Sequence, residues 1–206
     1  MKKVVMSMFV VILIITLIGC ESLSKRPDMY IEAAQLSKQE KDILELLGTN
    51  NEQLIYDFKL DNDVKSLQIN TYELINGTWK ISSGSDHAFS DNKGRFVLKF
   101  ENLAKGLRVA FQGEYKNGAS EYSSETEENF TGMSRATATL NNLTEITYEQ
   151  EIPLAVQILT AQNIVSAYNV EAFFTPEKYE KNGYEHVYAI TIRFSQKTLG
   201  ELDRGD

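Results

Sequence analysis

The sequence predicts a β-hairpin over Tyr72-Glu73-Leu74-Ile75-Asn76-Gly77-Thr78-Trp79-Lys80-Ile81. The alternation of apolar and polar residues in this hairpin recurs in much of the remaining chain. Asn76-Gly77 supplies the two positive φ angles of a type I′ turn, so we expect a two-residue loop with a fixed register. The predicted cross-strand pairs are Ile75 with Thr78, Leu74 with Trp79, Glu73 with Lys80 and Tyr72 with Ile81. Hydrophobic pairs then share one face of the hairpin, and an opposite-charge pair lies on the other.

Alternating apolar residues predict further strands on both sides of this hairpin. Their apolar positions are Leu54, Tyr56, Phe58 and Leu60; Phe96, Leu98 and Phe100; Leu107, Val109 and Phe111; Ala136 to Leu140; Ile152, Leu154, Val156 and Ile158; Tyr168, Val170, Ala172 and Phe174; and Tyr188, Ile190, Ile192 and Phe194. Pro153 indicates either an edge strand or a point where the chain enters a sheet. About eight or nine short strands favour a mainly β fold, an antiparallel β-sandwich of immunoglobulin-like or jelly-roll type.

One short amphipathic helix is predicted before the strands, over residues 37–48. Ser37-Lys38-Gln39-Glu40 is a capping box, and Gly48 suits the left-handed position that ends a helix. Ile43, Leu44 and Leu47 fall on one face at helical spacing, so we expect this face to pack on the domain.

The N-terminus has the pattern of an export signal. Lys2 and Lys3 precede an apolar run of fifteen residues from Val4 to Ile18. As a helix, this run would span only about 22 Å, against a hydrocarbon core of roughly 30 Å, so a transmembrane helix is disfavoured. A basic start, a short apolar run and small residues at its end are typical of a cleavable signal peptide.

The end of this run, Leu17-Ile18-Gly19-Cys20, resembles the lipobox of bacterial lipoproteins. The resemblance covers the leader and the cleavage site only. It implies removal of residues 1–19, a diacylglyceryl group on Cys20, and a lipid-anchored protein on the outer face of the bacterial cytoplasmic membrane. A plain signal peptide with an incidental cysteine is the alternative. We expect residues 20–36 to form a tether, partly helical near Ile31 to Ala34, and residues 37–206 to form one domain.

Composition narrows the possible functions. Residues 1–19 contain two of the 21 basic residues and none of the 29 acidic ones, so their removal changes the formal net charge from −8 to −10. Nucleic-acid binding is disfavoured because no cluster of basic residues is present. Cys20 is the only cysteine, so the folded domain contains no disulfide. We also expect no cofactor and no metal site.

Candidate catalytic residues are few. His87 and His186 are the only histidines, which argues against a zinc enzyme. His186 reads as a histidine at the edge of the core. His87 has Asp86 and Asp91 nearby, but no nucleophile motif accompanies it. Glu149 and Glu151 are predicted to share a strand face and form the best carboxylate pair for a glycan hydrolase, although a solvent-facing strand explains them more simply. The segment 61–63 lacks the remainder of a calcium loop and reads as a turn.

Two further segments have open interpretations. Aromatic residues are dense from Phe173 to Tyr184, where Tyr179 and Tyr184 could bind a ligand, although core packing at a sheet corner explains them better. Residues 113–134 include Glu121, Glu125, Glu127 and Glu128 and are predicted to form a long loop.

These observations favour a non-enzymatic domain at the cell envelope. Its expected partners are the membrane, through the lipid, and an envelope protein or glycan. The alternative is a carbohydrate-binding module or a carboxylate-dependent cell-wall glycan hydrolase.

Overall fold

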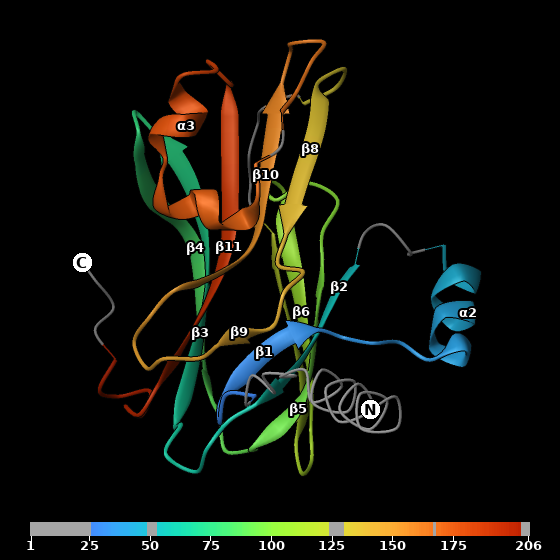
Figure 1. Ribbon diagram of the computed structural model, residues 1–206, viewed down its shortest axis with the longest axis vertical. Coiled ribbons are helices and arrows are strands. Elements are labelled where there is room, and N and C mark those ends of the chain that lie inside the picture. The colour runs from blue at the N-terminus through green and yellow to red at the C-terminus, as the bar shows by residue number, and fades with distance from the viewer. Residues whose placement is uncertain (1–25, 49–52, 124–129, 167, 203–206) are drawn as a thin grey trace, which may run out of the picture.

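The computed structural model describes residues 26–48, 53–123, 130–166 and 168–202. Within them, eleven strands form two antiparallel sheets that face each other (Figure 1). One sheet has six strands in the order β7-β6-β5-β2-β1-β9, and the other has five in the order β4-β3-β11-β10-β8. The predicted mainly β, antiparallel sandwich is confirmed.

The secondary structure elements have the following bounds. The strands are β1 Tyr30–Ala33, β2 Gln53–Lys59, β3 Ser66–Ile75, β4 Thr78–Ala88, β5 Lys93–Lys99, β6 Gly106–Gly113, β7 Asn117–Ser123, β8 Ser134–Thr139, β9 Thr144–Glu145, β10 Ile152–Thr160 and β11 His186–Ser195. The helices are α2 Lys38–Leu46, the 3₁₀ helix η1 Val170–Phe174 and α3 Glu177–Glu180.

The hairpin of β3 and β4 has the predicted turn and register. Asn76 and Gly77 have φ angles of 49° and 72°, and all four predicted pairs from Ile75–Thr78 to Tyr72–Ile81 are present. Below them the register shifts, because Thr71 pairs with Ser83 and leaves Ser82 as an additional residue in β4. This β-bulge lies in an edge strand, where bulges are common.

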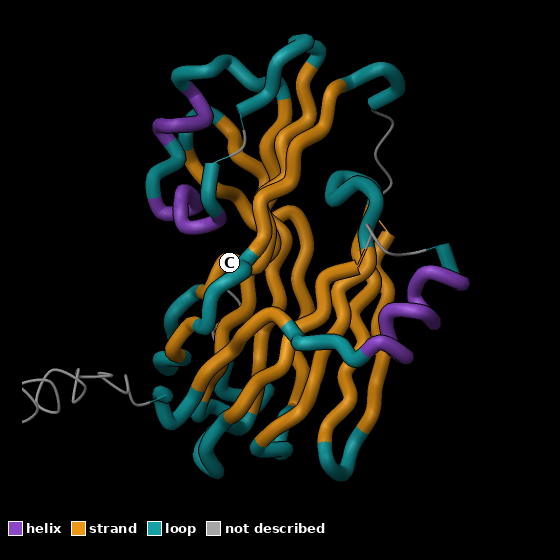
Figure 2. The backbone as a smooth tube through the Cα atoms, turned by 45° about the vertical axis from the view of Figure 1, so that its right-hand side comes forward, coloured by secondary structure: helices purple, strands orange, loops and turns teal. Residues whose placement is uncertain are grey.

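The core lies between the two sheets and is rich in aromatic and branched side chains. Tyr56 and Phe96 come from the six-stranded sheet, with ring centroids 5.3 Å apart, and Ile190 and Ile192 come from the five-stranded sheet. The buried hydroxyl of Tyr56 donates a hydrogen bond to the carbonyl oxygen of Leu154 in β10, at 3.0 Å. This bond joins the two sheets. Figure 2 shows the helices at the outside of the strand layers.

The segment expected to be a tether contains a strand of the sandwich. Residues from Ile31 to Ala34 were expected to be partly helical, yet Tyr30–Ala33 forms β1, hydrogen-bonded between β2 and β9. Ile31 is fully buried in the core. The four-residue strand carries too few alternating positions for its period to be recognised in the sequence. The ordered domain therefore begins well before residue 37.

The loop expected over residues 113–134 is interrupted by an edge strand. Asn117–Ser123 forms β7 and pairs with β6, and Glu121 forms an ion pair with Arg108 at 3.3 Å. This strand was not predicted because its sequence is rich in Gly, Ser and Asn, which are not typical of strands. Strand β7 buries little apolar surface, so it needs few of the residues that favour strands. Glu125, Glu127 and Glu128 lie outside the described residues.

The strand predicted around Val170 is instead helical. Residues Val170–Phe174 form η1, and α3 follows after Pro176. Phe173 is buried, and its neighbour Phe174 is exposed, which does not fit the predicted alternation. A short apolar alternation cannot separate a strand from a single helical turn. The ring of Trp79 stacks on Phe173 at 5.0 Å, so this segment covers the upper outer face of the five-stranded sheet.

Pro153 does not mark an edge. Its strand, β10, lies between β11 and β8 and is buried along its whole length. The register with β11 shifts between Pro153 and Ala155, because proline cannot donate a ladder hydrogen bond. The alternative interpretation of Pro153, as a point where the chain enters the sheet, agrees with this irregularity.

Helix α2 has the predicted cap but not the predicted packing. The Ser37 and Glu40 side chains form both hydrogen bonds of the capping box. No residue of the helix is buried, and Ile43 is 56% exposed. Instead, Arg95 of β5 pairs with Glu40 at 2.6 Å and with Asp57 of β2 at 2.6 Å. The helix therefore stands beside the sandwich (Figure 1), held at its N-terminal turn.

The cap of α2 should depend on pH. Hydrogen bonds from the Ser37 side chain and backbone, and then the Arg95 guanidinium, lower the pKa of Glu40 from 4.5 to about 2. Because the folded-state pKa is the lower one, this stabilisation is present above pH 4.5 and is lost as the pH falls toward about 2. NMR backbone shifts of α2 should therefore move toward coil values within that window, while those of β11 stay constant.

Two variants control this titration. Glu40→Gln should remove most of the pH dependence of the α2 shifts, whereas Glu45→Gln, in the same helix but outside the cap, should retain it. Identical titrations of the two variants would contradict the assigned role of Glu40.

Candidate functional site

The outer face of the five-stranded sheet changes character along its strands. Near the top, η1 and α3 cover it (Figure 1), and Phe173 of η1 packs on the rings of Tyr72 and Trp79. Lower down, β3 and β11 pair Gln68 with Arg193 and Asn70 with Thr191 on that face. Gln68 and Asn70 are only 5% and 7% exposed. Buried polar groups require hydrogen-bond partners, because each unpaired one costs roughly 1–3 kcal/mol.

Glu151 provides such partners at the centre of this polar stretch. Its carboxylate accepts a hydrogen bond from the Tyr72 hydroxyl at 3.1 Å and from the Asn70 amide at 3.3 Å. The Thr191 hydroxyl donates to its other oxygen. Three side chains on two adjacent strands therefore hold one carboxylate in a fixed position.

The protonation state of Tyr72 supports this arrangement. Burial and then the negative charge of Glu151 raise the pKa of Tyr72 to about 12. The hydroxyl consequently stays protonated at neutral pH and remains a donor to Glu151.

A second group of side chains adjoins the first. The Gln68 amide donates to Asp86 at 2.8 Å, and its oxygen accepts from the Arg193 guanidinium at 2.8 Å. Around both groups lies a cavity of about 450 Å³, which we call the acidic pocket. Its lining residues are Gln68, Asn70, Tyr72, Ile81, Gly84, Asp86, Glu149, Glu151, Arg193, Lys197 and Leu202.

Glu149 and Glu151 meet in this pocket, but not as residues of a strand. Both precede β10, which begins at Ile152, and Glu149 has a positive φ of 61°. The strand face predicted for them is wrong. The exposed Glu149 accepts a hydrogen bond from the Ser195 hydroxyl, and its backbone N–H donates to the Phe194 carbonyl at 2.9 Å. Both carboxylates are therefore fastened to β11.

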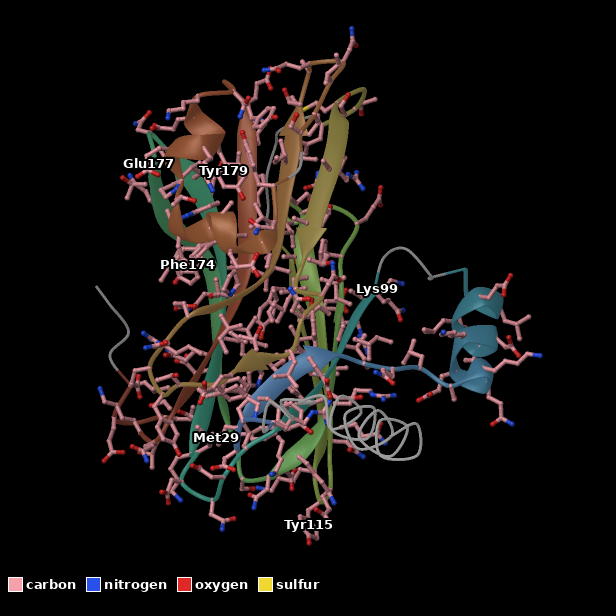
Figure 3. The ribbon with its side chains drawn as sticks, viewed as in Figure 1. Met29, Lys99, Tyr115, Phe174, Glu177 and Tyr179 are labelled. Atoms are coloured by element: carbon pink, nitrogen blue, oxygen red, sulfur yellow. The ribbon has the colours of Figure 1, made fainter. Side chains whose placement is uncertain are left out.

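The aromatic segment predicted as a possible ligand platform is packed into the structure. Tyr179, labelled in Figure 3, is 1% exposed. Its ring contacts the rings of Trp79 and Tyr168 edge-on. The partly buried Tyr184 hydroxyl accepts a hydrogen bond from the Ser166 backbone N–H at 3.0 Å. A ring as buried as Tyr179 offers no face to a ligand. These contacts agree with the alternative interpretation, core packing at a sheet corner.

His87 lies between the sheets at their open edge. Its Nε2 is 2.9 Å from the Ser85 hydroxyl and 3.4 Å from that of Tyr122. Burial lowers the pKa of His87, and Asp86 partly offsets this effect. A serine–histidine pair resembles part of a catalytic triad, but the Asp91 carboxylate is engaged by the Tyr115 backbone N–H at 3.2 Å.

His186 lies at the edge of the core, as predicted. It stacks on Tyr188 and contacts the ring of Phe130 edge-on. Its Nδ1 is 4.0 Å from Glu73, which also accepts a hydrogen bond from the Tyr188 hydroxyl at 3.1 Å. Glu73 and Tyr188 line a cavity of about 200 Å³ beside the bulge at Ser82.

The turn predicted over residues 61–63 is present. The backbone N–H of Asp63 donates to the Asp61 carboxylate at 2.9 Å, which is an Asx turn. Among the described residues, no group of three or more His, Cys, Asp and Glu side chains could hold a metal ion. In the same part of the chain, no helix is long and apolar enough to cross a membrane. Cys20, the predicted lipidation site, lies outside the described residues.

Five residues whose hydrogen bonds build the pocket were not predicted as site residues from the sequence, and Gln68 is one of them. The other four are Asn70, Tyr72, Thr191 and Arg193. Strand β11 was predicted from apolar positions on the opposite face, and β3 was predicted from its hairpin with β4, in which Tyr72 was assigned only a packing role. The polar alternation Ser66, Gln68, Asn70 is the signal that could have identified them, but an ordinary solvent-facing strand has the same pattern.

Comparison with known proteins gives one family match. A family model described as the YgaN domain matches residues 30–194, from the first residue of β1 to the penultimate residue of β11. No curated protein matches the chain, and no solved structure matches it.

Two tyrosine hydroxyls allow a matched test of the packing. Among the described residues, Tyr179 Oη is the buried side-chain polar atom that lacks a hydrogen-bond partner. We expect Tyr179→Phe to raise the free energy of unfolding by roughly 1 kcal/mol, because it removes an unsatisfied group. Tyr56→Phe should lower it by about 1 kcal/mol, because the bond to Leu154 is lost. Urea unfolding measures both free energies. A Tyr179→Phe variant less stable than wild type would contradict the conclusion that the Tyr179 hydroxyl is buried without a hydrogen-bond partner.

Proposed function

The chain belongs to the YgaN domain family, and we propose that it acts as a lipid-anchored, non-enzymatic binding domain on the outer face of the bacterial cytoplasmic membrane. The family description names no reaction, so the proposal rests on the leader sequence and on the acidic pocket. The leader supports the location, and the pocket supports the binding role.

The lipobox-like residues Leu17 to Cys20 support the anchor. Each buried CH₂ of an acyl chain contributes about 0.8 kcal/mol, so two chains on Cys20 hold a protein on a membrane stably. The formal charge of −10 after removal of residues 1–19 opposes adsorption of the domain to anionic headgroups. Lipid, and not the surface of the domain as a whole, then provides the attachment.

One observation carries the binding role: the carboxylate of Glu151 is held by Tyr72, Asn70 and Thr191 at the wall of an open cavity. Apolar side chains on this sheet face would give comparable stability without the cost of burying polar groups. A costly polar network on rigid strands is instead what a preorganised ligand site requires.

The charges around the pocket indicate the class of ligand. Asp86, Glu149 and Glu151 offer hydrogen-bond acceptors, while Arg193 and Lys197 offer donors. Tyr72 and Ile81 add apolar surface. This combination suits a ligand that carries several hydroxyl groups or an ammonium group, as the sugars of the cell wall do.

A cell-wall glycan hydrolase is the second candidate. It is favoured by one observation, that Glu149 and Glu151 line the same pocket, because glycoside hydrolysis uses two carboxyl groups. We place it second because three donors already occupy Glu151, so this group acts more readily as a fixed acceptor than as a proton donor or nucleophile.

A glycan-binding screen tests the pocket. Cell-wall glycan fragments should bind the wild-type protein, and Glu151→Gln should weaken binding about tenfold by removing one charged hydrogen bond. Glu177→Gln, the same exchange at an exposed position of α3, should bind as wild type does, and unfolding curves should confirm that both variants are folded. Glycan cleavage by wild type that disappears in Glu149→Gln and Glu151→Gln would favour the hydrolase, and neither binding nor cleavage would refute both roles.

Mass spectrometry of protein extracted from cell membranes tests the anchor. We expect a mature N-terminus at Cys20 that carries a diacylglyceryl group, and membrane association that is lost in Cys20→Ser. A free thiol on Cys20, or an intact leader in wild-type protein, would refute the anchor without affecting the pocket.

A further inference from the structure

The described chain enters the sandwich at one end and is fastened there. The Arg26 guanidinium bonds the Glu32 carboxylate at 2.6 Å and lies 4.6 Å above the ring of Tyr30. From Tyr30 onward the chain is strand β1. These contacts therefore hold Arg26 close to strand β1.

The turn between β6 and β7 lies at this same end. Strand pairing places Tyr30 opposite Lys59, Lys59 opposite Lys93, and the adjacent Gly94 opposite Gly113. Three strand spacings of about 4.8 Å separate β1 from β6. Figure 3 shows Met29 and Tyr115 toward the lower end of the sandwich, with Tyr179 and Glu177 at the upper end.

A buried carboxylate shapes the turn. Asp91 is 3% exposed, and it accepts a hydrogen bond from the Tyr115 backbone N–H at 3.2 Å. Gly113 makes room for it, since a Cβ at that position would lie 2.0 Å from the Asp91 carboxylate. The Gly113 N–H in turn donates to the Lys116 carbonyl at 2.8 Å. The Asp91 carboxylate and a backbone hydrogen bond within the turn therefore both stabilise its conformation.

Tyr115 projects from this supported turn with its side chain 83% exposed. Its neighbours Glu114 and Lys116 cancel in formal charge, and Glu114 also pairs with Lys93 at 3.7 Å. A tyrosine ring with an apolar body and a polar hydroxyl favours the headgroup region of a bilayer. The tip therefore combines an interfacial side chain with no net charge.

We propose that this turn rests on the bilayer surface, with Tyr115 among the lipid headgroups, so that the anchored domain stands on its β1 end. The proposal rests on the lipid anchor of the proposed function. Cys20 and Arg26 are six residues apart, which limits their separation to about 20 Å. Strand β11 has ten residues and spans about 33 Å, so the opposite end stays farther from the membrane than this tether reaches.

An orientation with the β1 end toward the membrane also limits the electrostatic repulsion between the acidic domain and anionic headgroups. A domain lying on its side would bring more of its net negative charge close to anionic headgroups, whereas the charges of Glu114 and Lys116 in the β6–β7 turn cancel. In the upright orientation the acidic pocket, on the outer face of the five-stranded sheet, opens parallel to the membrane plane and stays accessible to the cell wall.

Site-specific labelling of the lipidated protein tests this orientation. Because acylation occupies Cys20, an introduced cysteine is the only reactive thiol. Tyr115→Cys is compared with Ile164→Cys, which is 80% exposed at the opposite end, after β10. Each variant carries an environment-sensitive fluorophore and is placed in phosphatidylglycerol and phosphatidylethanolamine vesicles with a nitroxide near the lipid headgroup.

The label at position 115 should shift to the blue and be quenched by the nitroxide lipid, while the label at position 164 keeps its aqueous spectrum. Labelled Lys116→Cys should resemble Tyr115→Cys, which guards against a folding defect in one variant. Equal quenching at both ends, or none at either, overturns the orientation while the anchor stands. If position 115 is shielded without lipid quenching, the tip contacts a second copy of the chain and the proposal fails. If mass spectra show no acyl group on Cys20, both the proposed lipid anchor and the proposed orientation are refuted.

Discussion

The carboxylate of Glu151 fastens the chain where it crosses from one sheet to the other. Strand β9 belongs to the six-stranded sheet and β10 to the five-stranded sheet, and the connection between them lies over the outer face of β3 and β11. Three side-chain donors on those strands meet Glu151, and Glu149 adds a backbone and a side-chain bond to the end of β11. The same bonds that close the sandwich on this side also form the wall of the acidic pocket, so architecture and candidate site share one polar network.

Much of the fold could be predicted from the sequence because its signals are local. The type I′ turn at Asn76-Gly77 determines the register of β3 and β4, and the capping box at Ser37 determines where α2 begins. The predictions of secondary structure and packing were wrong where tertiary contacts, and not the local sequence pattern, determine the structure. Strand β1 is recognisable only from its pairing with β2 and β9, and η1 adopts its form because Phe173 packs on Trp79. The apolar face of α2 predicted docking, yet the Arg95–Glu40 ion pair holds the helix beside the sheet.

The candidate site was only partly predictable. Glu149 and Glu151 were chosen from the sequence as a pair, but the geometry assumed for them was that of a strand, and they lie in a connection. The partners of Glu151 are 40 to 81 residues away along the chain, so no spacing rule could associate them. Tyr179 illustrates the opposite error. Aromatic density suggested recognition, whereas burial against Trp79 and Tyr168 assigns it to the core.

Helix α2 interrupts what would otherwise be a simple hairpin, because β1 and β2 are antiparallel neighbours in one sheet. The ladder between these strands does not depend on what joins them, and doubling the length of a flexible connection costs only about 0.6 kcal/mol. This connection can therefore be lengthened, shortened or replaced at little cost to the two packed sheets. In practical terms, the α2 segment is the natural place to graft a reporter or an epitope onto the domain.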